Sequence, residues 1–219
     1  MKVVIAGSSG MIGSLILTHC LDSDKISEVR ILVRKPTGQK HSKLKEFVIA
    51  DFNDYSQHPS LFKDVHCGFF CVGVYTGQVD DALFKIITVD YAVQFAKALA
   101  TQSPQATCCL LSGGGADRSE KSKTAFARYK GMAENQISKL NLKFYSFRPG
   151  YIYPVEPRNE PNLAYKIMRS FYPLIKIFGK KYSIKSTELA YAIFKVGIYG
   201  AEKQFLENRD ILNLADGKI

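Results

Sequence analysis

A glycine-rich loop close to the N-terminus is the feature of the sequence that most directly indicates chemistry. The run Lys2-Val3-Val4-Ile5-Ala6 leads into residues 7–13, Gly-Ser-Ser-Gly-Met-Ile-Gly, and apolar residues then recur at helical spacing. Glycines between a strand and a helix clear the backbone for a pyrophosphate, which binds the N–H groups at the start of the helix. A tight turn in any α/β protein is the alternative. We predict a dinucleotide site to which this loop contributes Gly7, Ser9, Gly10, Met11, Ile12 and Gly13.

The end of the second predicted strand indicates which dinucleotide binds. An NAD site normally places Asp or Glu there, about 20 residues after the glycines, to accept the ribose hydroxyls. Here Ile31-Leu32-Val33 is followed by Arg34 and Lys35, with no acidic residue in reach. A guanidinium binds a 2′-phosphate through charge-assisted hydrogen bonds, whereas a carboxylate would repel it. The sequence therefore favours NADP, with NADPH preferred over NADH; two exposed charges without a ligand are the alternative.

Two further strand ends carry residues suited to the adenosine half of such a cofactor. Asp51 follows the third predicted strand and could accept the adenine amino group, while Phe52 packs on the ring. Val72 and Gly73 follow the fourth, where a small residue lets the adenine ribose lie close to the backbone.

These residues must be positioned by strands and helices that alternate along the chain, the pattern of a parallel sheet with right-handed crossovers. Strands are predicted at residues 2–6, 29–33, 46–50, 67–72, 107–111 and 143–148. Helices are predicted at 10–21, 80–101 and 121–140, and the third crossover, at 55–63, is short and irregular. We predict an α/β Rossmann fold, a doubly wound parallel sheet of order 3-2-1-4-5-6, with the cofactor at the switch point between strands one and four.

The regular alternation of predicted strands and helices ends after residue 150. We predict one domain over residues 1–219, with a dinucleotide-binding core at 1–150 and a small C-terminal helical lobe at 151–219 that closes over the substrate. Its helices are expected at 162–178 and 187–199. Residues 171–182 interleave aromatics with lysines, which we interpret as a helix with a buried apolar face; contact with a membrane surface or a partner is the alternative.

Composition excludes several classes of function. The 219 residues carry a net charge of +10, but the basic residues are scattered and form no nucleic-acid-reading motif, so we expect no specific nucleic-acid binding. Part of this charge can steer an anionic cofactor. No apolar run is long enough to span a membrane, and the N-terminus is a strand of the fold rather than a signal peptide.

The five cysteines indicate a reducing compartment. Most of them stand in apolar, strand-like runs, so we expect buried, reduced thiols and a cytoplasmic protein. None has the spacing of a zinc ligand set, and we expect no metal site. The cysteines are Cys20, Cys67, Cys71, Cys108 and Cys109.

A series of motifs covers nearly the whole chain. They are AGSSGMIGS at 6–14, LVRK at 32–35, ADF at 50–52, FCVG at 70–73, LLSGGGAD at 110–117, YKGMAE at 129–134, FRPG at 147–150 and FLENRDI at 205–211. In this order the chain resembles the atypical, extended-type short-chain dehydrogenase/reductases, and among them the Tat-interacting-protein-like oxidoreductases. The resemblance implies a Rossmann fold, a nicotinamide cofactor and a reductase of small carbonyl compounds.

The resemblance also implies a Ser-Tyr-Lys catalytic set, of which this chain keeps only part. Lys130 matches the lysine, but Phe126 stands where the proton-donating tyrosine is expected, four residues earlier. Tyr129 is no substitute, because an adjacent helical residue points about 100° away from Lys130. Ser112 matches the serine, although Gly113 stands at the position expected to act.

The family turn beside the nicotinamide is matched by Arg148-Pro149-Gly150, so we assign Pro149 and Gly150 to the cofactor site. General acid catalysis contributes about 10²–10⁴ in rate, so the loss of the tyrosine leaves several hypotheses open. The first is an NADP-dependent reductase of an unknown small carbonyl substrate with a degenerate site, in which Tyr75, Tyr151 or Tyr153 could replace the donor. The second is a non-catalytic NADPH sensor that binds a protein partner or a second copy of itself. The third is a quinone-type or ylidene-type reductase that needs only hydride delivery and a proton from solvent.

Overall fold

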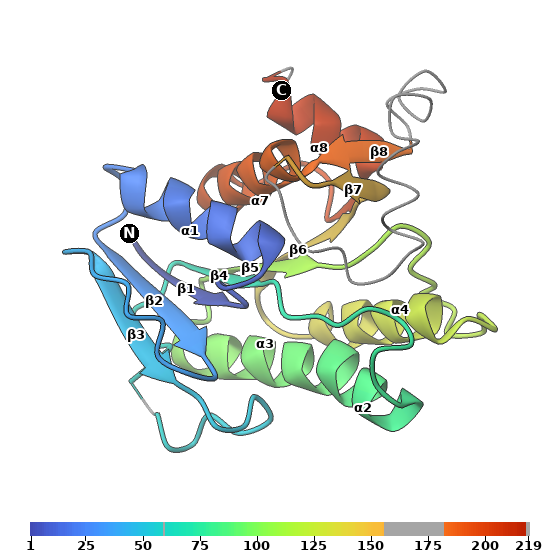
Figure 1. The fold of residues 1–219 in the computed structure, drawn as a ribbon, viewed down its shortest axis with the longest axis horizontal. Coiled ribbons are helices and arrows are strands. Elements are labelled where there is room, and N and C mark those ends of the chain that lie inside the picture. The colour runs from blue at the N-terminus through green and yellow to red at the C-terminus, as the bar shows by residue number, and fades with distance from the viewer. Residues whose placement is uncertain (59, 156–181, 218–219) are drawn as a thin grey trace.

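A parallel sheet forms the centre of the protein in a computed structural model that describes residues 1–58, 60–155 and 182–217. Within those residues the sheet has seven strands in the order β3-β2-β1-β4-β5-β6-β9 (Figure 1). Its inner strands are apolar and almost wholly buried, because helices cover both faces. The strands are β1 (Lys2–Ala6), β2 (Glu28–Val33), β3 (Leu44–Val48), β4 (Cys67–Phe70), β5 (Thr107–Leu111), β6 (Lys143–Arg148) and β9 (Phe205–Glu207).

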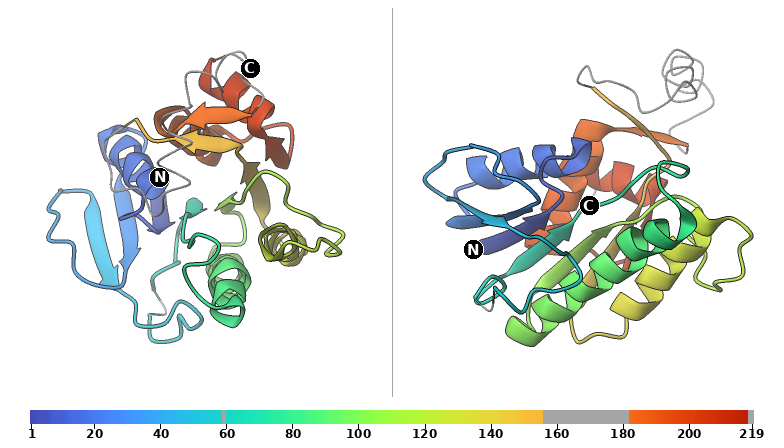
Figure 2. Two further views of the ribbon diagram at one scale, coloured as in Figure 1. Left: turned by 45° about the vertical axis from the view of Figure 1, so that its right-hand side comes forward. Right: turned by 60° about the horizontal axis from the view of Figure 1, so that its bottom comes forward.

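Two helical layers cover the two faces of the sheet, as the additional views also show (Figure 2). One layer consists of α1 (Met11–Asp22), α7 (Ser186–Tyr199) and α8 (Asn208–Ala215), which share an apolar core with one face. The other consists of α2 (Asp81–Lys85), a π-helical turn (Ile86–Asp90), α3 (Tyr91–Gln102) and α4 (Ala125–Ile137). The described residues after 150 thus belong to the same core as α1.

A small parallel pair, β7 (Tyr151–Tyr153) and β8 (Ser183–Lys185), stands beyond the end of β6. Asn208 at the start of α8 fixes the turn that leads into it. Its side-chain oxygen accepts from the Gly150 N–H at 2.8 Å, and its amide donates to the Ser183 carbonyl at 3.1 Å. The Pro-Gly turn that the sequence assigns to the cofactor is therefore held by the C-terminal part of the chain.

The predicted fold class and the order of the first six strands are confirmed, with corrections to particular elements. The third strand begins at Leu44 rather than residue 46, because the backbone N–H of Val29 already bonds Lys43. The helix predicted at 80–101 contains a π-helical turn. The helix predicted at 121–140 begins only at Ala125, since Asp117 accepts the backbone N–H groups of residues 119, 121 and 122 and folds them into a loop.

Several elements beyond residue 150 were not predicted, namely β7, β8, β9 and α8. The helix expected at 187–199 is present as α7. The helix expected at 162–178, and all but one residue of the aromatic and lysine segment 171–182, lie outside the described residues.

The helix α4 must pack tightly to position the residues of the site. Gly131 is buried against the preceding loop, and a Cβ placed on it would lie only 1.8 Å from the Asp117 carbonyl oxygen. The backbone of α4 can therefore approach this loop only with glycine at position 131.

We expect Gly131→Ala to destabilise the protein strongly, because the new methyl group must push α4 away from the Asp117 loop. Overpacking costs roughly 1–3 kcal/mol or more, so the melting temperature should fall by roughly 5 °C. Gly73→Ala is the matched control, since nothing lies within 4 Å of a Cβ at that position. Equal melting temperatures for the two variants in thermal denaturation would contradict this packing.

Candidate functional site

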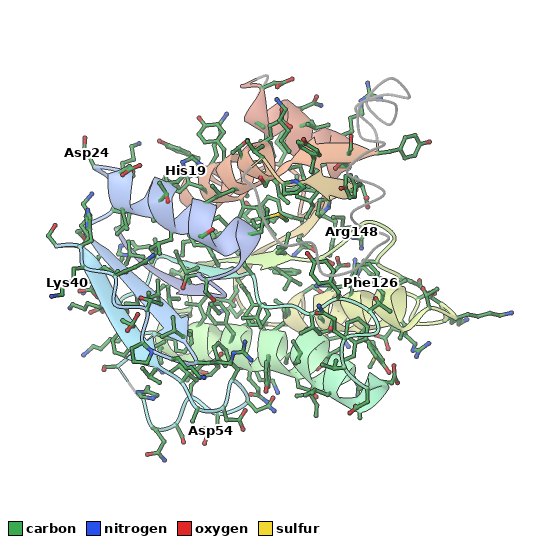
Figure 3. The ribbon with its side chains drawn as sticks, viewed as in Figure 1. His19, Asp24, Lys40, Asp54, Phe126 and Arg148 are labelled. Carbon is green, nitrogen blue, oxygen red and sulfur yellow. The ribbon has the colours of Figure 1, made fainter. Side chains whose placement is uncertain are left out.

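A cavity of about 1000 Å³ opens at the carboxyl ends of the central strands. The start of α1 and the loops that follow β4, β5 and β6 form its walls, and Phe126 and Lys130 of α4 also line it. Phe126 lies at the start of α4 and Arg148 at the end of β6 (Figure 3). A second cavity, of about 680 Å³, lies among the first residues of β5 and β6 and the ends of α7 and α8, and none of the predicted site residues lines it.

Glycine is needed at each of the three positions in the N-terminal loop for a different physical reason. Gly7 has a φ of +85°, and its Cβ would lie 2.7 Å from the Cys71 backbone. A Cβ on Gly13 would lie 2.1 Å from the Gly7 carbonyl oxygen, so both glycines allow close packing of β1, α1 and the end of β4. Gly10 has an ordinary extended conformation, with φ −83° and ψ 166°, and lines the cavity. Its missing side chain leaves room on the cavity side.

The start of α1 is suited to an anion. No side chain caps it, and its first turn contains no acidic residue. The N-terminal end of a helix carries partial positive charge and N–H groups that bind phosphate. Together with the space beside Gly10, these residues fit the pyrophosphate of a dinucleotide.

The structure brings only part of the predicted site together. Gly10, Met11, Ile12, Val72, Gly73, Ser112, Lys130, Pro149 and Gly150 line the cavity. The residues that do not line it are Gly7, Ser9, Gly13, Arg34, Lys35, Asp51 and Phe52.

The predicted residues outside the cavity occupy two kinds of position. Arg34 and Lys35 are exposed directly after β2, at the same sheet edge as the glycine loop. Phe52 was expected to pack on adenine, but it is buried, with its ring centroid 5.7 Å from that of Tyr91 and 6.4 Å from that of Tyr55. Asp51 is exposed, and its side chain accepts the backbone N–H of Asn53 at 2.8 Å.

Lys130 stands in the wall of the cavity one helical turn after Phe126. Its Nζ donates a hydrogen bond to the Leu111 carbonyl at 3.1 Å. Burial lowers the pKa of this lysine to about 8, while the Glu134 carboxylate and the Cys71 thiol act in the opposite direction. Tyr129 is turned away, as the sequence predicted, because its hydroxyl donates to Asp81 of α2 at 2.6 Å.

Phe126 and Gly113 form a complementary pair. A Cβ on Gly113 would lie 2.4 Å from Cζ of the Phe126 ring. The ring therefore fills the space that a serine at position 113 would need, and the two departures from the expected Ser-Tyr-Lys set are coupled by packing. A serine can be introduced at position 113 only if the ring moves.

Glu134 was not predicted as part of the site, and it organises this end of α4. Its carboxylate is fully buried and accepts hydrogen bonds from Ser112 Oγ at 2.8 Å and Ser146 Oγ at 2.7 Å. Arg148 adds two bonds, from Nε at 3.0 Å and Nη2 at 2.5 Å, and reaches Glu207 of β9 through Nη1 at 2.9 Å. These bonds raise the pKa of the guanidinium above its usual range. The Ser112 proton is thus directed to Glu134 rather than into the cavity.

A signal for Glu134 was present in the sequence. Phe126, Lys130 and Glu134 follow one another at intervals of four residues, which places them on one face of a helix. An acidic residue on the face that carries Lys130, with Arg148 at the end of a neighbouring strand, indicates a buried ion pair.

The sequence and the fold were compared with known proteins. A model of the NAD-dependent epimerase/dehydratase family matches residues 3–194. The chain belongs to this family. The resemblance to extended-type short-chain dehydrogenase/reductases that the motifs indicated is thereby confirmed. A comparison with curated protein sequences finds no match.

Solved structures of the same fold include enzymes crystallised with nicotinamide cofactors. WbmG of Bordetella bronchiseptica, in complex with NAD, is 16% identical with a TM-score of 0.67, over 94% of this chain and 72% of its own. Gre2 of Candida albicans, in complex with NADPH, is 12% identical with a TM-score of 0.71, over 94% and 77%. A short-chain dehydrogenase/reductase of Saccharomyces cerevisiae is 15% identical with a TM-score of 0.67, over 98% of each chain. At such identities the likeness shows the fold alone.

Membrane-spanning helices, metal sites and disulfides can be assessed for the described residues. No helix among them has the length and apolar character needed to cross a membrane. They contain no group of three or more His, Cys, Asp or Glu side chains that could hold a metal ion. All five cysteines are free thiols, and four of them are buried.

The pKa of Lys130 predicts how stability depends on pH. The folded pKa of about 8 lies below the ordinary value of about 10.4, so the unfolded chain binds more protons between these two pH values. Wild-type stability should therefore rise relative to Lys130→Met as the pH increases from 8 to 10.5. Melting temperatures measured across this range test the sign. A constant difference for Lys130→Met would contradict the lowered pKa.

Proposed function

We propose that the protein is an NADPH-dependent reductase of a small carbonyl compound that works without the tyrosine expected one helical turn before Lys130; Tyr75 and Tyr151, two of the alternative donors considered from the sequence, line the same cavity. The observation that carries the proposal is the cavity itself, in which the glycine loop, Lys130 and the Pro149-Gly150 turn meet around the phenyl ring of Phe126. The family match supports a nicotinamide cofactor, as do the solved structures of WbmG with NAD and of Gre2 with NADPH.

Different residues around the cavity would bind different parts of the cofactor. Gly10 and the start of α1 would hold the pyrophosphate, and Val72 and Gly73 would lie along the adenine ribose. Lys130, Pro149 and Gly150 would lie beside the nicotinamide half. When bound, the reduced nicotinamide supplies a hydride to the substrate.

Lys130 has the donors and the charge for the reacting end of the site. An ammonium has three N–H donors, and one of them is used by the Leu111 carbonyl. The others can bind ribose hydroxyls and place positive charge where negative charge develops on the substrate oxygen. Ser112 donates its proton to Glu134, so its hydroxyl is left to accept hydrogen bonds and to shape the wall.

The preference for NADPH rests on the residues after β2. Arg34 and Lys35 are exposed there and can bind a 2′-phosphate. The Glu46 carboxylate in the same region is engaged by Thr37, which donates its backbone N–H at 3.0 Å and its hydroxyl. Because Glu46 is bonded to Thr37, Arg34 and Lys35 are the residues that we expect to recognise the 2′ position of the ribose.

We also propose a cytoplasmic location. Five free cysteines, four of them buried, suit a compartment in which thiols stay reduced. The four buried cysteines lie within β4, β5 and α1 and have a packing role.

The glycine loop provides the test of the reductase itself. Wild type should bind NADPH in calorimetry and oxidise it when a carbonyl acceptor is added, whereas Gly10→Val should do neither. Gly10 has a backbone conformation that valine adopts. The added Cβ would lie 3.3 Å from the Gly7 carbonyl oxygen, a tight contact that a shift of a few tenths of an ångström relieves, so we expect the variant to fold with its side chain in the phosphate space. Ser14→Val, an exposed change one turn along α1, is the matched control and should keep both properties.

Circular dichroism establishes that the Gly10→Val protein is folded. Retained NADPH affinity in that folded variant would contradict the assignment of the pyrophosphate site. NADPH binding by wild type without oxidation by any carbonyl acceptor would contradict the reductase and favour a non-catalytic sensor.

The basic pair predicts the cofactor preference. Wild type should bind NADPH at least roughly tenfold more tightly than NADH, because hydrogen bonds to charged groups contribute about 1.5–3 kcal/mol. Arg34→Ala should remove most of this difference, and Lys40→Ala, at an exposed lysine further along the loop, should keep it. Dissociation constants from calorimetry measure both; equal constants for the two cofactors in wild type would refute the assignment.

A further inference from the structure

The character of the cavity narrows the class of substrate, given the reductase proposed above. Among the described residues that line it, Lys130 is the single charged side chain. The described lining of the cavity also includes the apolar side chains of Val74, Leu111 and Ile152. A substrate that suits this surface is mostly apolar and carries one oxygen that can accept the charge of Lys130.

The phenyl ring of Phe126 forms part of this wall. A Cβ on Gly113 would lie 2.4 Å from its Cζ, so the ring occupies the space next to Gly113. The ring is partly buried, packs against the apolar core below α4, and also lines the cavity. Aromatic rings prefer offset-stacked or edge-to-face neighbours, so a flat π-system is the partner that this wall recognises best.

Position 126 carries no hydroxyl, and this also favours a conjugated acceptor over a simple ketone, for a chemical reason. Hydride addition to a simple ketone leaves an alkoxide, which is about as basic as hydroxide (water pKa about 15.7) and needs a proton during the step. Hydride addition to a quinone leaves a phenolate-type anion, whose conjugate acid has a pKa of about 10. That anion is stable enough to be protonated afterwards. Phe126 therefore obstructs the first reaction far more than the second.

We propose that the substrate is a planar conjugated acceptor of the quinone class, which lies against the Phe126 ring with an oxygen toward Lys130. The two electrons and one hydrogen arrive as hydride from the reduced nicotinamide dinucleotide. As its C–H bond breaks, an O–H bond forms at one quinone carbonyl, the ring becomes aromatic, and the second C=O, the one toward Lys130, becomes a phenolate-type C–O⁻. The Lys130 ammonium stabilises this anion and passes it a proton, which water restores to the lysine. The net change is quinone plus reduced cofactor plus one proton to hydroquinone plus oxidised cofactor.

The pKa of Lys130 agrees with this proton transfer. A value of about 8 leaves the amine mostly protonated at pH 7, and it lies below that of a phenol, so the transfer runs toward the product. The charged and titratable groups that face Lys130 are Glu134 on its own helix and the Cys71 thiol after β4, both of which raise its pKa.

The first test compares acceptors. With NADPH, the kcat/KM for menadione should exceed that for cyclohexanone by at least roughly 10²-fold, the rate usually supplied by general acid catalysis. The Gly10→Val protein measures the uncatalysed background for menadione. Equal kcat/KM values for the two acceptors would overturn the substrate class while leaving the reductase in place. Absence of NADPH oxidation with either would overturn the reductase.

The second test measures recognition without turnover. Calorimetry of 1-naphthol, a planar phenol that cannot be reduced, with the protein loaded with NADP⁺ should show binding that Phe126→Leu weakens roughly two- to tenfold, the size of an aromatic pair. The affinity for NADP⁺ should be unchanged. Phe205→Leu, at a partly buried phenylalanine of β9 that does not line the cavity, is the matched control. Equal naphthol affinities for wild type and Phe126→Leu would overturn the role of the ring.

Discussion

The fully buried carboxylate of Glu134 is the interaction on which the geometry of the cavity depends. Taking a carboxylate out of water costs several kcal/mol, and only a well-formed set of partners offsets that cost. Here the partners are Arg148 and the hydroxyls of Ser112 and Ser146; Ser112 follows β5, and Ser146 and Arg148 belong to the neighbouring strand β6. Because Glu134 lies on the same helical face as Lys130 and Phe126, these bonds also fix where those two side chains stand. Glu207, the last residue of β9, also accepts a hydrogen bond from Arg148.

The same carboxylate sets the electrostatics of the site. Burial alone would favour a neutral Lys130, and Glu134 counters this, so that near neutral pH Lys130 keeps a positive charge in a cavity whose other described lining residues are uncharged. The same carboxylate accepts the hydrogen bond that the Ser112 hydroxyl donates, so this hydroxyl is not available to donate to a substrate carbonyl. The site therefore has one strong electrostatic feature, an ammonium, beside one flat apolar surface, the Phe126 ring. Both properties follow from groups on α4.

The order of the strands and the glycine loop could be predicted because each depends on local patterns. Alternating apolar strands and amphipathic helices restrict the topology to a few right-handed arrangements, and a glycine with φ of +85° between a strand and a helix has few structural alternatives. Phe52 shows where such reasoning ends. The sequence placed it at a strand end, and only the structure shows that its ring is buried in an aromatic cluster with Tyr55 and Tyr91; its contact with adenine stays a prediction. The short strands β7, β8 and β9 lacked a periodic pattern long enough to identify them.

The sequence by itself determined that the chain has a glycine-rich loop between a strand and a helix, a basic end to β2, a lysine where the family resemblance expects one and no hydroxyl one turn before it. Those features are residue types at fixed spacing, and no folding can change them. Only the tertiary structure decided that the Phe126 ring fills the space above Gly113, that Ser112 donates to Glu134, and that Asn208 holds the turn at Gly150. Each of these joins residues from different elements of the chain. Their contact depends on packing distances of a few ångströms, which the linear spacing of residues does not specify.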